Sequence, residues 1–149
     1  MNERRTIIIT LLIGVWISFM DAGGLRAEDL SPLGLWQNED ATFQIFESNG
    51  KLAAKIVALK VPKTPDGREK TDIHNPDPAK RNTPIIGLVF MSGFAKKSEK
   101  RWEGGTVYDP ESGNTYSCSM ELESPEKIKA RGFIGISLIG RTEYWSRVK

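Results

Sequence analysis

Residues 141–148, RTEYWSRV, are the last alternating stretch of this 149-residue chain. In an extended strand, one face carries a tyrosine between two hydroxyl residues, and the other carries Trp145 between Glu143 and Arg147. Neither face is wholly polar, so the strand is most stable when both of its edges are paired. Closure into a β-barrel provides this pairing, and the stretch therefore favours a barrel over an open sandwich.

Turn signals divide the preceding chain into short alternating runs, and no long helical pattern is visible. Asn49-Gly50 separates the runs 41–48 and 51–60 and predicts a hairpin, although the second run also has the spacing of an amphipathic helix. Another turn, at 109–113, joins two further runs. Such signals about every ten residues indicate an antiparallel sandwich or barrel. With the closing strand, we predict an all-β, up-and-down barrel of about eight to ten strands.

The N-terminus has the layout of a secretory signal peptide. Arg4 and Arg5 precede an apolar run at 6–20, and a small residue, Ala27, follows. The run is shorter than the roughly 20 residues of a spanning helix. We therefore predict a signal peptide at 1–27, cleaved before a single domain at 28–149, with no membrane span afterwards and a periplasmic or secreted location. An uncleaved membrane anchor is the alternative.

Composition limits the remaining possibilities. The 21 basic and 19 acidic residues give a formal charge of +2, spread along the chain, which argues against a nucleic-acid partner. Cys118 is the only cysteine, so no internal disulfide can form. It occupies an alternate position of a predicted strand, and we interpret it as a small buried residue, in preference to a nucleophile.

Residues 61–83 contain four prolines and form the least regular segment, long for a loop in a compact domain. The residues that we expect to shape it are Asp72, Asn75, Pro76, Asp77, Pro78 and Arg81. Asn75 and Asp77 precede prolines, which favours extended backbone, and their side chains can bond nearby amides. Asp77 is positioned to cap one helical turn at 78–81, and Arg81 to pair with a loop carboxylate. We predict a shaped strap across a barrel end.

This loop also holds the only histidine, His74. A hydrolytic metal centre needs about three His, Cys or carboxylate ligands, and no Gly-x-Ser-x-Gly element accompanies a possible serine triad. We therefore expect no catalytic residues, no metal and no cofactor. An enzyme using Asp72, His74 and Asp77 is a distant alternative.

Both ends of the domain resemble the lipocalin and wider calycin pattern. Gly34-Leu35-Trp36 is similar to the Gly-x-Trp that begins the first strand of those barrels, and Arg147 lies near the end of the last run. Antiparallel pairing of the first and last strands brings the Arg147 guanidinium over the Trp36 ring. We therefore predict a cation–π contact between them. Gly34, Trp36 and Arg147 are structural residues in this interpretation.

Three longer segments are more specific, namely TDIHNPDPAKRNTPIIGLVFMSGF (71–94), RWEGGTVYDPESGNTYSCSMEL (101–122) and ARGFIGISLIGRTEYWSRV (130–148). Together they resemble the bacterial DUF2147 family, with a match over about 34–148. The resemblance implies a small exported domain with a lipocalin-like barrel. It implies no catalysed reaction.

The second segment also has a physical interpretation. Gly104 and Gly105 permit a bulge or a close backbone approach, and Gly113 can close the following turn with positive φ. Tyr108 and Tyr116 flank this turn and are expected to pair across it.

The leading functional hypothesis is a binding protein that holds a small hydrophobic molecule inside the barrel. The residues expected to line the site are Phe43, Phe90, Phe94, Phe133, Tyr108 and Tyr116. The same residues can instead fill a solid core. The alternative hypothesis is an envelope or secreted interaction module that binds an unknown protein partner through the loop at 61–83, without a cavity.

Overall fold

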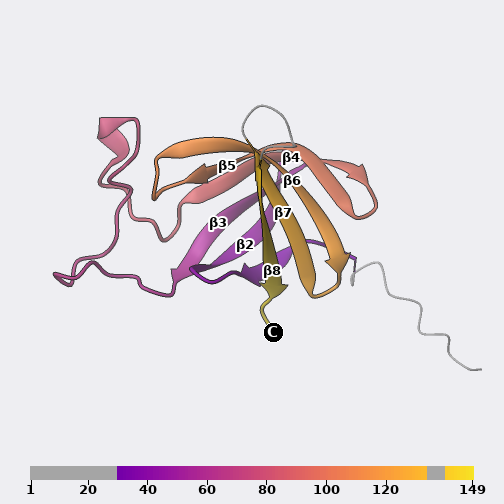
Figure 1. The fold of residues 1–149 in the computed structure, drawn as a ribbon, viewed down its shortest axis with the longest axis horizontal. Coiled ribbons are helices and arrows are strands. Elements are labelled where there is room, and N and C mark those ends of the chain that lie inside the picture. Colours follow the sequence, from indigo (N-terminus) through magenta and orange to yellow (C-terminus); the bar gives the residue numbers. More distant parts are fainter. Residues whose placement is uncertain (1–29, 134–139) are drawn as a thin grey trace, which may run out of the picture.

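The chain forms a barrel of eight antiparallel strands (Figure 1). The computed structural model describes residues 30–133 and 140–149, so the predicted signal peptide at 1–27 lies outside the described residues. The strands are β1 (Gly34–Gln37), β2 (Ala41–Ser48), β3 (Lys51–Leu59), β4 (Val89–Ser98), β5 (Arg101–Asp109), β6 (Asn114–Ser124), β7 (Lys127–Phe133) and β8 (Gly140–Arg147). Within these ranges, no helix is both long enough and apolar enough to cross a membrane.

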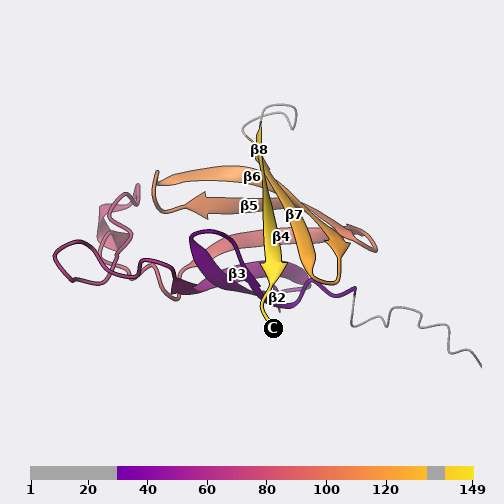
Figure 2. The same ribbon diagram turned by 60° about the horizontal axis from the view of Figure 1, so that its bottom comes forward.

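Each strand pairs with the next one along the chain, and β8 pairs with β1, which closes the barrel (Figure 2). The closing pairs are Trp36 with Arg147 and Gln37 with Ser146. The predicted up-and-down barrel is thus confirmed, at the lower end of the expected strand number. β8 pairs with β7 over residues 140–146 along one edge, and its C-terminal end, at Ser146 and Arg147, pairs with β1 along the other.

The hairpin of β2 and β3 turns at Asn49 and Gly50, whose φ angles of 52° and 72° both lie in the left-handed region. Asparagine and glycine tolerate this geometry best, and it matches the twist of the two strands. Residues 51–59 therefore form the predicted return strand, and the alternative of an amphipathic helix is wrong. Pairing with β2 over the whole strand outweighs the helical spacing.

One end of the barrel, which we name the closed end, is sealed by residues 30–33 and by the β6–β7 turn. Trp36 Nε1 donates to the carbonyl of Pro32 at 2.8 Å. The predicted cation–π contact is present, with 4.3 Å between the Arg147 guanidinium carbon and the centroid of the Trp36 ring. The fully buried side chains toward this end include Trp36, Phe94, Leu122 and Ile128. Here the barrel is solid.

The two glycines of β5 have the roles expected from the sequence. Gly104 has a φ of +74°, and the register with β6 shifts between Trp102 and Gly105, which identifies a bulge. A Cβ on Gly105 would lie 2.2 Å from the Phe94 ring, so the ring packs directly on this backbone. The bulge reverses which side chains of β5 face inward.

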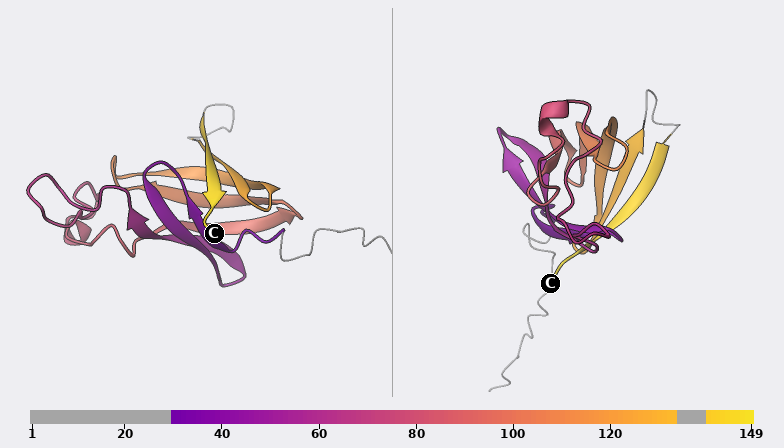
Figure 3. Two further views of the ribbon diagram at one scale, coloured as in Figure 1. Left: turned by 90° about the horizontal axis from the view of Figure 1, so that it is seen from below. Right: turned by 90° about the vertical axis from the view of Figure 1, so that its left-hand side faces the viewer.

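The connection between β3 and β4 spans residues 60–88 and contains a short 3₁₀ helix, η1 (Pro78–Lys80). It extends beyond the end of the barrel opposite the closed end and lies in front of that opening (Figure 1; Figure 3, right). We name this the open end. The long loop therefore lies beside the open end (Figure 1).

Candidate binding site at the open end of the barrel

Strand alternation defines the inner wall near the open end. Val107 pairs with Tyr116 on the same face as buried Cys118, and Glu143 pairs with buried Ala130. Val107, Tyr116 and Glu143 therefore face inward, yet each is partly exposed. Toward the closed end, by contrast, Trp36, Phe94, Leu122 and Ile128 are fully buried. Solvent therefore reaches the inner wall at the open end.

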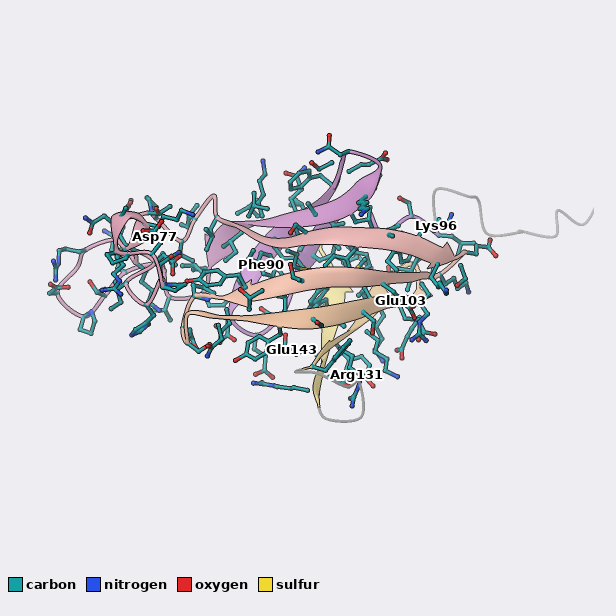
Figure 4. The ribbon with its side chains drawn as sticks, turned by 90° about the horizontal axis from the view of Figure 1, so that it is seen from above. Asp77, Phe90, Lys96, Glu103, Arg131 and Glu143 are labelled. Carbon is teal, nitrogen blue, oxygen red and sulfur yellow. The ribbon has the colours of Figure 1, made fainter. Side chains whose placement is uncertain are left out.

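Aromatic rings continue from the core into this wall. The Phe43 ring lies 4.8 Å from the Trp145 ring and 5.4 Å from the Phe90 ring, both in edge-to-face contact. A register shift between β3 and β4 turns Phe90 inward beside Met91, where strict alternation would point it outward. Phe90 is partly buried and lies on the loop side of the barrel, with Asp77 of the loop beyond it and Lys96 at the opposite end (Figure 4).

The six predicted ligand-lining residues do not form one surface. Phe43 and Phe94 are buried in the core, and Phe90 and Tyr116 are inward and partly exposed. Tyr108 and Phe133 lie on the outer face, where their cross-strand partners are Thr115 and Ser117. The expected pairing of Tyr108 with Tyr116 is wrong, because the bulge places the two tyrosines on opposite faces.

Tyr108 instead fastens the long loop to the β5–β6 hairpin. Its hydroxyl donates to Asp72 Oδ1 at 2.7 Å, and Asn75 Nδ2 donates to Asp72 Oδ2 at 2.6 Å. The Asp72 residue is completely buried, so these two donors replace the water molecules that would hydrate its carboxylate in solvent. Desolvation and the Asp72 hydrogen bond raise the pKa of Tyr108 to about 12, which keeps the phenol a donor. We name this contact the Asp72 clamp.

The rest of the loop motif organises the loop itself. Asp77 caps η1 by accepting from the Ala79 amide at 3.0 Å, and Asn75 Oδ1 accepts from the Asp77 amide at 2.9 Å. Pro78 begins η1. Arg81 Nε donates to the Asn75 carbonyl at 2.9 Å, where the sequence had suggested a carboxylate partner. These contacts give the loop a fixed shape.

His74 contacts the hairpin through its backbone. A Cβ on Gly113 would lie 2.1 Å from the His74 carbonyl oxygen, and Gly113 has a φ of +71°. Only glycine fits both the turn and this approach. Among the described residues, no group of three His, Cys, Asp or Glu side chains is placed to hold a metal ion.

Cys118 lies on the inner wall between Gly105 and Gly132. Burial raises the pKa of its thiol to about 12, with a smaller contribution from the Glu143 charge. A thiol held in its protonated form is a poor nucleophile. Its place between two glycines is that of a small core residue.

A shallow pocket of about 90 Å³ lies on the outer wall, between side chains of β5, β6 and β7 that include Arg101, Lys129 and Glu121. Arg101 already pairs with Glu103 at 2.6 Å. The charged part of its lining is mostly basic, with Arg101, Lys129 and Arg131 against Glu121, which lies between Arg101 and Lys129 across the strands.

Val107 and Glu143 are residues of the inner wall that the sequence had not marked as functional. The closing stretch did place Glu143, Trp145 and Arg147 on one face, and the structure shows that this face is the inner one. The signal available in the sequence was that two charged residues, Glu143 and Arg147, share a strand face with Trp145.

Comparisons with known proteins agree with this architecture. The family model described as "Uncharacterized protein conserved in bacteria (DUF2147)" matches residues 34–147. No curated protein shows significant similarity. Among solved structures, protein HP1028 from the human pathogen Helicobacter pylori, described as belonging to the lipocalin family, superposes with a TM-score of 0.71 at 26% identity, over 80% of this chain and 84% of that one.

Proposed function

Because this chain belongs to the DUF2147 family and folds as a lipocalin-like barrel, we propose that it is an exported binding protein for a small, largely apolar molecule. The proposed site is the inner wall at the open end, formed by Phe90, Val107, Tyr116 and Glu143 over the Phe43 and Trp145 rings.

One observation carries the proposal. Inward residues at the open end keep solvent access, whereas Trp36, Phe94, Leu122 and Ile128 toward the closed end are fully buried. An inner wall that is apolar and yet reachable by solvent gains free energy when an apolar ligand covers it. The hydrogen-bonded loop beside this end offers a further contact surface.

The test is binding of a neutral apolar fluorophore, N-phenyl-1-naphthylamine, to the purified protein, measured as an increase in its fluorescence. Saturable fluorescence enhancement that Val107→Glu removes supports an interior site, because a charge on the inner wall opposes an apolar occupant. Thr106→Glu is the matched control, since Thr106 is the exposed outward neighbour on the same strand. No saturable binding, or equal loss in both variants, contradicts the proposal.

Export is tested separately. We expect the chain to be processed after Ala27, as the charged start, the apolar run and the small residue favour. The mass of the native protein recovered from a bacterial envelope fraction should correspond to a chain beginning at Glu28. Recovery of the full-length chain from the cytoplasm would refute this part of the proposal.

A second candidate function, a protein-interaction module, is favoured by one feature of the loop. Ile73 directly follows the buried Asp72 and is 58% exposed, and Val61 at the start of the loop is 62% exposed. The Asp72 clamp therefore fixes an apolar side chain in solvent. Ile73→Ser should abolish a pull-down that depends on the loop while leaving the melting temperature unchanged. An unchanged pull-down would exclude this role of Ile73.

A further inference from the structure

Glu143 is a carboxylate on an otherwise largely apolar inner wall. It pairs across the sheet with buried Ala130, and the next inward residue along β8 is buried Trp145. Its side chain is 41% exposed. Glutamate is rarely placed on the inner face of a small barrel unless its charge has a partner or a use.

The protein contacts of this carboxylate are long. Glu143 Oε2 accepts from Trp145 Nε1 at 3.4 Å and from Asn38 Nδ2 at 3.5 Å. The Arg141 Nε lies 3.8 Å from Oε1, on a side chain that is 87% exposed. An N–H···O hydrogen bond is normally about 2.7–3.2 Å long, and about 2.7–2.9 Å when both groups are charged. The contacts orient Glu143 but leave good acceptor positions on both oxygens.

The neighbours of Glu143 suit a cation. Trp145, which contacts Glu143 through its Nε1, packs edge-to-face with the Phe43 ring. Phe43 in turn packs edge-to-face with Phe90. The negative charge of Glu143 also reaches Cys118, further along the inner wall. Aromatic rings and a carboxylate side by side attract ammonium groups, through the ring quadrupole and through charge-assisted hydrogen bonds.

We propose that Glu143 is the polar anchor of the interior site and that the ligand class is amphiphilic amines, with an apolar body against Phe90 and Val107 and a protonated amine at Glu143. The inference rests on the proposed function and deepens it. A fatty-acid carboxylate would place like charges together on the inner wall, which is unfavourable. The exposed Arg141 guanidinium offers an anion only a solvated contact.

The experiment compares three probes with the same twelve-carbon chain, dodecylamine, dodecanol and dodecanoate, as competitors of the fluorophore below their aggregation concentrations. We expect dodecylamine to displace the fluorophore at a concentration about tenfold lower than dodecanoate, with dodecanol between them. In Glu143→Gln, the difference between amine and acid should fall to about twofold or less.

Matched variants separate the outcomes. Glu121→Gln removes a carboxylate from the outer face and should keep the amine preference. Glu143→Asp keeps the inner charge and should retain part of that preference, and circular dichroism verifies folding. Equal affinity for amine and acid, or a preference that survives Glu143→Gln, overturns the inference while leaving the proposed function intact. Binding of none of the probes overturns both.

Discussion

The Arg147 guanidinium lies over the Trp36 indole at 4.3 Å and also donates to three backbone carbonyls. These are Ser31 at 2.5 Å, Leu33 at 2.9 Å and Pro125 at 2.6 Å. A single side chain of β8 thus joins the N-terminal segment, β1 and the β6–β7 turn. The closed end depends on this geometry because a planar fork of donors can serve several acceptors at once.

Arg147→Lys tests this relationship. Lysine keeps the charge but cannot reach three diverging carbonyls while stacking on the indole, so we expect a loss of about 2 kcal/mol of unfolding free energy. Urea denaturation measures it. Arg141→Lys, at the exposed start of the same strand, should change stability by less than about 0.5 kcal/mol. Equal effects of the two variants would show that the closed end does not depend on the Arg147 fork.

Gly105→Ala should destabilise the core strongly. The new methyl group would lie 2.2 Å from the Phe94 ring, and that ring is fully buried and has nowhere to move. We expect a cost of about 3 kcal/mol, at the upper end for overpacking. Gly132→Ala is the control, since a Cβ there meets its nearest neighbour, Val107, only at 4.0 Å. A similar small change in both variants would argue against the close approach.

The overall fold could be predicted because its signals are local. Asn49-Gly50 determines a hairpin through its own backbone preferences, and RTEYWSRV carries the mixed faces that favour closure. Trp36 and Arg147 could be paired once the first and last strands were taken as neighbours. None of these inferences depends on an exact register in the middle of the sheet.

The site was harder to predict because two bulges change which side chains face inward. Counting in twos from Trp102 places Tyr108 inside, and the bulge at Gly104 moves it to the outer face. The irregular register of β4 has the opposite effect on Phe90. The outer position of Phe133 could have been predicted, because Phe133 lies on the same strand face as two basic residues, Lys129 and Arg131. The hydrogen bond between Asp72 and Tyr108 spans 36 positions, beyond any local pattern.

Tyr108→Phe should release the loop without unfolding the barrel. It leaves Asp72 buried with one donor fewer, at a cost of about 1–3 kcal/mol. Hydrogen exchange of the amides of Asp72 and Asn75, which bond within the loop, should accelerate at least about tenfold. Tyr144→Phe is the control, because Tyr144 is exposed on β8. Unchanged exchange in Tyr108→Phe would show that the Asp72 clamp does not hold the loop.

Alkaline titration tests the same contact through the Tyr108 proton. Its pKa in the folded protein, about 12, exceeds the ordinary tyrosine value of 10.0, so folding favours the protonated phenol. The resulting stabilisation is complete below pH 10 and is lost as the pH rises toward 12. Absorbance at the phenolate band should show one of the three tyrosines ionising late. Tyr108→Phe should remove that late step, and its persistence would assign it to another tyrosine.

Cys118 provides a measure of how tightly the inner wall is packed. Its thiol pKa of about 12, against an ordinary value of 9.0, lowers the thiolate fraction at pH 8 by about a thousandfold. Because burial also blocks access, alkylation by iodoacetamide should be at least that much slower in the native protein than in urea. A ligand on the inner wall should slow it further, since Cys118 follows Tyr116 on the same inward face. Rapid native alkylation at pH 8 would mean that the middle of the barrel opens readily to solvent, and would contradict the solid core seen beneath the proposed site.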